Sequence, residues 1–181
     1  MFRKFAIGSI FEKVPCPIVG LDTDDFRAKR SQEFRIPLIS TVGERMIGIA
    51  GYARRSACRP PARDVIAVCA SGKGAGGCFY YPGRIAVSPD FYAVKLKGGD
   101  ICSYPEGLFL ATALELALFN GKAKQNGAAW ENIKNVYVEL PVIDRELKGY
   151  LYSASDIDAC FMASTMPELT KELVREGGIL T

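Results

Sequence analysis

Residues 64–88 decide the fold, and their four pieces read Asp64-Val65-Ile66-Ala67-Val68-Cys69-Ala70, Gly72-Lys73-Gly74-Ala75-Gly76-Gly77, Cys78-Phe79-Tyr80-Tyr81-Pro82 and Arg84-Ile85-Ala86-Val87-Ser88. The first and last pieces are apolar and rich in β-branched residues, which predicts a strand on either side of a loop. Four glycines within residues 72–77, here called the glycine loop, let the backbone turn tightly and approach another group closely. This part of the chain therefore predicts a β-rich core with one unusual loop.

The glycine loop does not fit either of the common nucleotide-binding patterns. A phosphate loop needs a Lys-Ser or Lys-Thr pair after its last glycine and then a helix, whereas Lys73 comes early and the following residues look extended. A dinucleotide fingerprint must also open a helix, and residues 72–77 do not. Two interpretations stay open: a flexible hairpin between two strands, and a loop that presents Lys73 and nearby tyrosines to a polyanion.

The composition predicts one globular domain and excludes several kinds of catalytic site. The chain has 181 residues, of which 49% are hydrophobic and 24% charged. The six cysteines form no Cys-x-x-Cys pair, so we expect reduced thiols in a cytoplasmic protein. The chain has no histidine, which excludes Cys-His zinc sites, Ser-His-Asp triads and acid–base catalysis by histidine.

Positive charge is concentrated in the first part of the chain. Residues 1–100 hold 16 Lys and Arg against 9 Asp and Glu, a net charge of +7, and residues 101–181 hold 7 against 11, a net charge of −4. Such a division suits a protein that meets a polyanion with one part and another partner with the other. Chance asymmetry on a solvated surface is the alternative.

The remaining patterns predict an α+β fold, with a single mixed domain built on a strongly twisted, β-rich core. Further strands are expected over residues 34–40, 47–52, 91–96 and 135–142, and Pro37 places the first at an edge or a bulge. One buried helix is expected over about 106–120, because its residues are apolar almost all round and Asn120-Gly121 ends it. That helix is too short to span a bilayer, so no membrane is expected. A short amphipathic helix is expected over 167–176.

An arginine-rich stretch follows the second of these strands. Residues 53–63 include Arg54, Arg55 and Arg59 and contain no acidic residue. Guanidinium groups bind phosphate oxygens in pairs, so an exposed loop of this kind is a candidate phosphate-contacting surface. A plain solubilising loop is the other interpretation.

The order of several motifs resembles a known family. The motifs are Phe5-x-Ile7-Gly8-x-Ile10-Phe11-Glu12, Pro37-Leu38-Ile39-Ser40, Gly48-Ile49-Ala50-Gly51-Tyr52, Phe79-Tyr80-Tyr81, Leu108-Phe109-Leu110, Lys124 before Trp130, Val138-Glu139-Leu140-Pro141-Val142 and Ile157-Asp158-x-x-Phe161-Met162. Their order and spacing, over residues 2–166, resemble the target recognition domain of DNA specificity subunits in type I restriction-modification systems and related type IIB systems. Each motif alone is weakly specific.

The resemblance implies a DNA-binding domain over residues 1–165 and a short helix over 166–181, the remnant or start of a dimerisation helix. It implies recognition of a short half-site in double-stranded DNA, with no active site and no cofactor of its own. Methyl transfer and cleavage would belong to a modification methyltransferase subunit and a restriction subunit. Because family members carry two such domains with long helices, this chain is expected to be a half-subunit that forms a homodimer, a truncated copy, or a domain of another system.

The candidate DNA-binding residues come from the basic loops and their polar neighbours. For phosphates they are Arg54, Arg55, Arg59, Lys73, Arg84, Lys122 and Lys124, and for base edges Tyr80, Tyr81, Gln125 and Asn126. Tyr80 and Trp130 are equally candidates for the core, and for Trp130 the core is the favoured interpretation. The resemblance places base contacts in variable loops and does not assign them to particular residues.

Two other functions stay open. A hydrolase would take its acids or a metal site from Asp22, Asp24, Asp25 or the pair Asp156 and Asp158, and its nucleophile from Cys69 or Cys78, although no nucleophile is paired with a base. A protein-interaction module would keep the fold without binding DNA, and its acidic second part would hold a partner.

Overall fold

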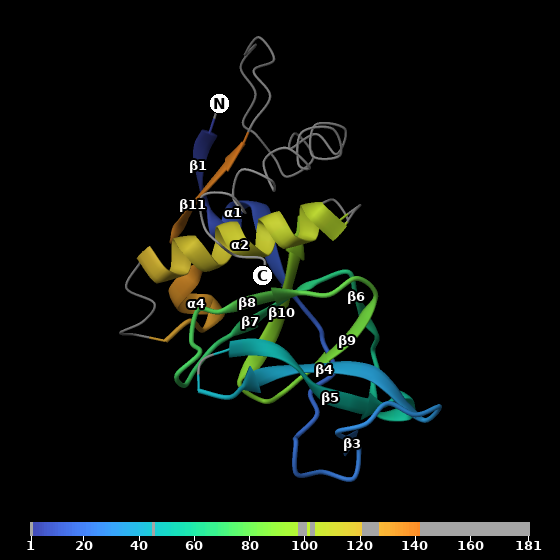
Figure 1. Cartoon of the computed structure of the whole chain (residues 1–181). Helices are drawn as coiled ribbons and strands as arrows, with labels where there is room; N and C mark the ends of the chain where they lie inside the picture. Colours follow the sequence, from blue (N-terminus) through green and yellow to red (C-terminus); the bar gives the residue numbers. More distant parts are fainter. Residues whose placement is uncertain (1, 45, 98–100, 102–103, 121–126, 142–181) are drawn as a thin grey trace.

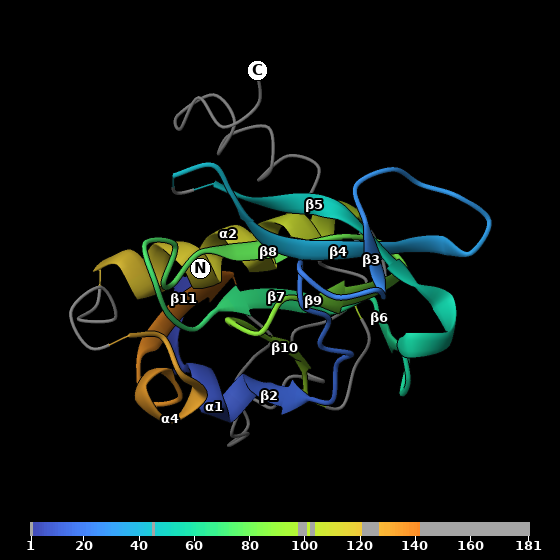
Figure 2. The same ribbon diagram turned by 90° about the horizontal axis from the view of Figure 1, so that it is seen from below.

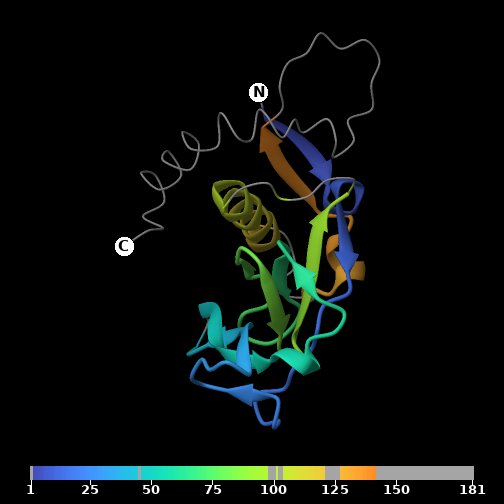
Figure 3. The same ribbon diagram turned by 90° about the vertical axis from the view of Figure 1, so that its right-hand side faces the viewer.

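A computed structural model gives the structure of the chain and describes residues 2–44, 46–97, 101, 104–120 and 127–141. Three β-sheets and helix α2 (Tyr104–Asn120) form its framework. Figure 1 shows α2 lying across the sheets, with the two-stranded sheet and strand β3 at opposite ends of the described part, and Figure 3 shows the same arrangement from the side. The mixed α+β class predicted from the sequence is confirmed.

A four-stranded antiparallel sheet lies in the middle of the molecule. Its strands, in spatial order, are β2 (Phe11–Val14), β10 (Phe91–Leu96), β7 (Ile66–Cys69) and β8 (Cys78–Tyr80). Alternate side chains of β7 point to opposite faces: Ile66 and Val68 join the core beneath α2, and Ala67 and Cys69 join the core shared with the next sheet. Burial on both faces explains why this strand is apolar throughout.

A five-stranded sheet packs against the other face. Its strands, in spatial order, are β3 (Phe26–Arg27), β5 (Met46–Arg54), β4 (Phe34–Val42), β9 (Arg84–Val87) and β6 (Ala62–Arg63). The β4–β9 pair is parallel and the other pairs are antiparallel. Pro37 lies on a strand with a neighbour on each side, and the β4–β5 register shifts on both sides of it. The bulge prediction for Pro37 is therefore confirmed and the edge prediction is wrong.

The third sheet pairs strand β1 (Phe2–Ala6) with strand β11 (Tyr137–Pro141) in antiparallel register. The short helices α1 (Ile7–Ile10) and α4 (Trp130–Ile133) lie beside it. Trp130 is half-buried and packs against the core, as the sequence favoured. Helix α2 contacts both β8 and β11, so it connects the central sheet with this small one.

Helix α2 ends at Asn120 as predicted, but it is not buried all round. Leu110, Leu114 and Leu118 are fully buried between the sheets, whereas Leu116 is 57% exposed. The helix is therefore buried on the side that faces the sheets, as expected, and exposed on its other side within the described residues. None of the described helices is both long enough and apolar enough to span a bilayer.

The glycine loop joins β7 to β8, and not to the strand that the sequence suggested. Residues 78–80 pair antiparallel with β7, whereas β9 belongs to the five-stranded sheet. The loop is thus a hairpin connection, with Gly72 at φ 77° and Gly76 at φ 87°, in the left-handed region that favours glycine. The expected helix over 167–176 and the boundary between residues 165 and 166 lie outside the described residues, as do Asp156 and Asp158.

Candidate nucleic-acid interface

Three arginines line one groove at the edge of the five-stranded sheet. Arg55 begins the short 3-10 helix η1 (Arg55–Ala57), which follows β5 directly, and Arg84 begins β9. With Arg59 they surround a hollow of about 680 Å³, whose other lining residues are Gln32, Glu33, Ser56, Pro60 and Pro61. Segments far apart in the sequence therefore bring their guanidinium groups to one place.

Two hydrogen bonds to backbone carbonyl oxygens hold two sides of this groove in place. The backbone N–H of Arg55 donates to the carbonyl oxygen of Glu33 at 3.0 Å, which holds η1 against the loop that precedes β4. The Arg84 guanidinium donates from Nη2 to the carbonyl oxygen of Cys58 at 3.2 Å. The Arg84 Nε is buried and has no hydrogen-bond partner within the described residues. A buried unpaired donor is costly, so an anion that accepted from it would be favoured.

The groove carries an excess of positive charge. Its lining holds three arginines and one acidic residue, which gives a formal charge of +2. Arg55 and Arg59 are exposed and form no ion pair with any residue in the described ranges. The one carboxylate, Glu33, is paired with Arg54. The groove is thus suited to bind an anion with several oxygens.

Arg54, also predicted to contact phosphate, does not line this groove and has acidic partners of its own. Its guanidinium forms ion pairs with Asp25, Nε to Oδ1 at 3.0 Å, and with Glu33, and it donates to the carbonyl oxygen of Asp24 at 3.2 Å. It also lies over the ring of Phe34, 4.8 Å from the centroid. Arg54 therefore ties the residues on both sides of β3 to the end of β5, and its charge is already balanced.

Lys73 lies at the opposite end of the β4–β5 ribbon. A Cβ added to Gly77 would lie 2.7 Å from Ile47, so the glycine loop packs against the start of β5, whereas Arg55 follows its end. Arg54 lies seven positions after Ile47, which is about 23 Å of strand at about 3.3 Å per residue. Figure 2 shows the glycine loop beside the β4–β5 turn and β3 at the other end. Lys73 is exposed and forms no ion pair with a described residue.

Tyr80 is a core residue, which was one of the two interpretations that the sequence left open. Its side chain is only 4% exposed, and its ring centroid lies 6.1 Å from that of Tyr104. Burial, with nearby Asp64 and Glu106, raises the pKa of the Tyr80 hydroxyl to about 12. Tyr81 is half-buried and packs against the core between the two larger sheets.

The other four predicted residues, Lys122, Lys124, Gln125 and Asn126, lie outside the described residues. The described residues on either side of them do approach the glycine-loop end of the molecule. A Cβ on Gly76 would lie 3.4 Å from Leu118, and the N–H of Ala128 donates to the carbonyl oxygen of Ala70 at 2.8 Å. The structure thus separates the predicted site into an arginine groove and a glycine-loop end.

Sequence reasoning missed Gln32, whose amide side chain lines the arginine groove. Amide side chains pair bidentately with adenine, and Gln32 is exposed. In the sequence it lies more than twenty residues before the arginines, in a loop with no distinctive pattern. Gln32 becomes a candidate DNA contact only because the folded chain brings its loop next to η1.

The hydrolase alternative finds no support in the described residues. Burial raises the pKa of Cys69 and Cys78, so both thiols are protonated and poorly nucleophilic. Asp25 is engaged by Arg54. Within the described part of the chain, no group of three or more acidic or cysteine side chains is placed to hold a metal ion.

The fold of this chain is similar to part of two solved structures. The S subunit of a type I restriction-modification system from M. genitalium matches 97% of this chain and 41% of its own, with a TM-score of 0.56 and 13% sequence identity. The HsdS subunit from Thermoanaerobacter tengcongensis matches 97% of this chain and 40% of its own, with a TM-score of 0.47 and 9% identity. No family model and no curated protein matches the sequence. The chain therefore has the fold of part of a type I S subunit and spans about two-fifths of its length.

Proposed function

We propose that this protein recognises double-stranded DNA as the specificity component of a restriction-modification system, and that the arginine groove holds the DNA backbone. The observation that carries this proposal is the convergence of Arg55, Arg59 and Arg84 on one groove, where none of the three forms an ion pair with a described residue. Phosphate oxygens are the anionic groups that a fork of guanidinium donors fits best. The fold shared with a type I S subunit supports the same function.

The three arginines have different roles in this proposal. Arg84 is held by Cys58, so its fork is oriented before DNA arrives and loses little entropy on binding. Arg55 and Arg59 are exposed and add charge and further phosphate contacts. Gln32, beside them, is the proposed reader of a base edge, since phosphate contacts alone give no sequence preference.

The glycine-loop end supplies a second contact with the DNA backbone through Lys73. The strand length of about 23 Å between the two ends corresponds to about seven base pairs at about 3.4 Å each. A half-site of that length suits one recognition domain. Lys122, Lys124, Gln125 and Asn126 stay proposed DNA contacts, because the described residues that flank them in the sequence approach that end.

The protein is proposed to act without catalysis or a cofactor of its own. A modification methyltransferase subunit would supply methyl transfer, and a restriction subunit would supply cleavage. Since the chain spans 41% of the S subunit it matches, a homodimer is the proposed route to a two-part target site. The protein is proposed to act in the cytoplasm, where such a complex would meet DNA.

A salt titration tests the proposal. Fluorescence anisotropy would give the affinity of the chain for a mixed-sequence duplex at several salt concentrations. Four phosphate contacts, from Arg55, Arg59, Arg84 and Lys73, predict a slope of about −3.6 for the logarithm of affinity against that of salt. An affinity that does not change with salt would contradict the proposal and favour the protein-interaction alternative.

A further inference from the structure

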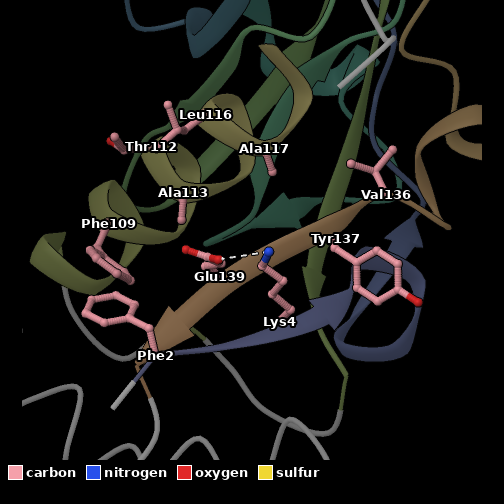
Figure 4. Close-up of a pocket in the computed structure, with 10 residues that line it drawn as sticks. All are labelled: Phe2, Lys4, Phe109, Thr112, Ala113, Leu116, Ala117, Val136, Tyr137 and Glu139. Carbon is pink, nitrogen blue, oxygen red and sulfur yellow. Dashed lines mark ion pairs between the residues drawn. The ribbon is translucent and has the colours of Figure 1, made fainter. Parts of the chain in front are cut away.

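A second groove lies on the side of the molecule formed by α2 and the two-stranded sheet. Its volume is about 510 Å³, and Phe2, Phe109, Leu116 and Tyr137, drawn in Figure 4, are among the residues of β1, α2 and β11 that line it. Phe2 is 55% exposed, Leu116 57% and Tyr137 64%. An ion pair between Lys4 and Glu139, Nζ to Oε1 at 3.5 Å, is the charged contact drawn within it. An apolar hollow of this size is typical of a surface that another segment covers.

The chain itself continues from the edge of this groove. Pro141, the last described residue, pairs with Phe2 across the two-stranded sheet, and Phe2 lines the groove. Forty residues, 142–181, follow it, and nineteen of them are hydrophobic. That share is close to the 49% of the whole chain, and a solvated tail would hold far fewer apolar residues. These residues therefore have apolar surface to bury within reach of a groove that needs covering.

We propose that residues 166–176 of this chain bind in the groove between α2 and the β1–β11 sheet as an amphipathic helix. Met166, Leu169 and Leu173 recur at spacings of three and four, the pattern of a helix that places three anchors in an apolar groove. On the opposite side of such a helix lie Lys171 and Arg175, which would face water. We propose docking within one molecule, since 24 residues separate Pro141 from Met166 and can span up to about 80 Å, which is enough to reach the groove.

This inference is independent of DNA binding. The groove and the arginine groove share no lining residue. Docking of residues 166–176 would cover exposed side chains of α2 and β11 and would fix the end of the chain to the small sheet. If the chain failed to bind DNA, the docking proposal would be unaffected. If residues 166–176 failed to dock, the DNA-binding proposal would be unaffected.

Photocrosslinking in the full-length chain identifies the occupant directly. Leu116 is exposed, so we would replace it with the photoreactive residue p-benzoylphenylalanine, irradiate an equal mixture of isotopically light and heavy chains, and map the crosslinked peptides by mass spectrometry. The expected products join position 116 to residues 166–176 within chains of one isotopic form. Products that join light to heavy chains would show a second copy in the groove and overturn docking within one molecule. Products with other segments, or no product, would overturn it as well.

Two matched variants test the proposed orientation of the helix. Leu173→Glu and Lys171→Gln each change the net charge by −1, one on the apolar side and one on the charged side. The proposal predicts that Leu173→Glu lowers the crosslink yield at least about fivefold and that Lys171→Gln leaves it unchanged. Equal losses in both variants, or no loss in Leu173→Glu, would contradict the docking of Leu173 in the groove.

Discussion

Arg84 and Cys58 are joined by a hydrogen bond from the guanidinium Nη2 to the carbonyl oxygen, at 3.2 Å. This bond links the start of β9 to the loop that follows η1, two segments separated by 25 residues. It fixes one guanidinium of the groove while leaving its Nε without a partner in the described residues. Through this bond the fold holds the Arg84 guanidinium in the position in which we propose that it binds a DNA phosphate.

Replacing Arg84 with lysine tests whether the fork or only the charge matters. Arg84→Lys keeps the charge but loses the planar donors and the bond to Cys58, so we expect DNA affinity to fall about tenfold. The slope of affinity against salt should stay nearly unchanged, because the number of charges is the same. Anisotropy titrations of both proteins give the two quantities. An unchanged affinity would show that Arg84 contributes only charge.

Removing Arg55 and Arg59 together should flatten the salt dependence. Each lost phosphate contact reduces the slope by about 0.9, so the double alanine variant should bind more weakly with a slope smaller by about 1.8. Lys95→Ala is the control, since Lys95 lies on β10 and pairs with Glu12 at 3.7 Å, away from the groove. If the control weakened binding as much per charge as the double variant, the groove would not be the DNA contact.

Arg54→Ala should affect stability and leave DNA contacts intact. The change removes the ion pairs with Asp25 and Glu33 and the contact with Phe34. Because these groups are partly exposed, we expect the free energy of unfolding to fall by only about 1 kcal/mol. Urea denaturation measures that loss, and anisotropy should give an affinity close to that of the original protein. A loss of affinity like that of Arg55→Ala would return Arg54 to the binding surface.

Gly107→Ala should destabilise the protein through Tyr80. A Cβ on Gly107 would lie 2.2 Å from Tyr80 Cε1, so helix α2 or the ring must shift, at a cost of about 1–3 kcal/mol. Gly48→Ala is the matched control, since its Cβ would meet only Val42, at an ordinary 3.7 Å. Thermal or urea unfolding compares the two. Equal stability of both variants would show that Tyr80 is not packed against α2.

The strands could be predicted from the sequence, but their partners could not. The apolar run at Ile66–Cys69 signals a strand by itself, whereas its burial on both faces depends on which sheets pack around it. Strand β8 is three residues long and follows the glycine loop directly, so its pattern is too short to distinguish from a loop. The parallel β4–β9 pair joins segments over forty residues apart, and no local signal marks such pairing.

The candidate site was predictable in composition but not in geometry. Arg54 and Arg55 are adjacent and equivalent in the sequence, yet the β3–β5 pairing carries Asp25 to Arg54 and leaves Arg55 unpaired in the described part of the chain. The sequence allows Tyr80 to be either a residue that contacts base edges or a core residue, and only the packing of α2 against its ring decides for the core. Gln32 carried no signal, because its position beside the arginines comes from tertiary packing alone.

The most direct test of the central claim is selection from a pool of random duplex DNA. The purified chain would be incubated with the pool at low and at higher salt, and the retained duplexes would be sequenced. DNA recognition predicts enrichment of one short motif, of about seven base pairs or fewer, with weaker retention at higher salt and loss of retention in the Arg55→Ala, Arg59→Ala double variant. Equal retention of every sequence, or no retention at low salt, would contradict sequence-specific DNA recognition by this chain.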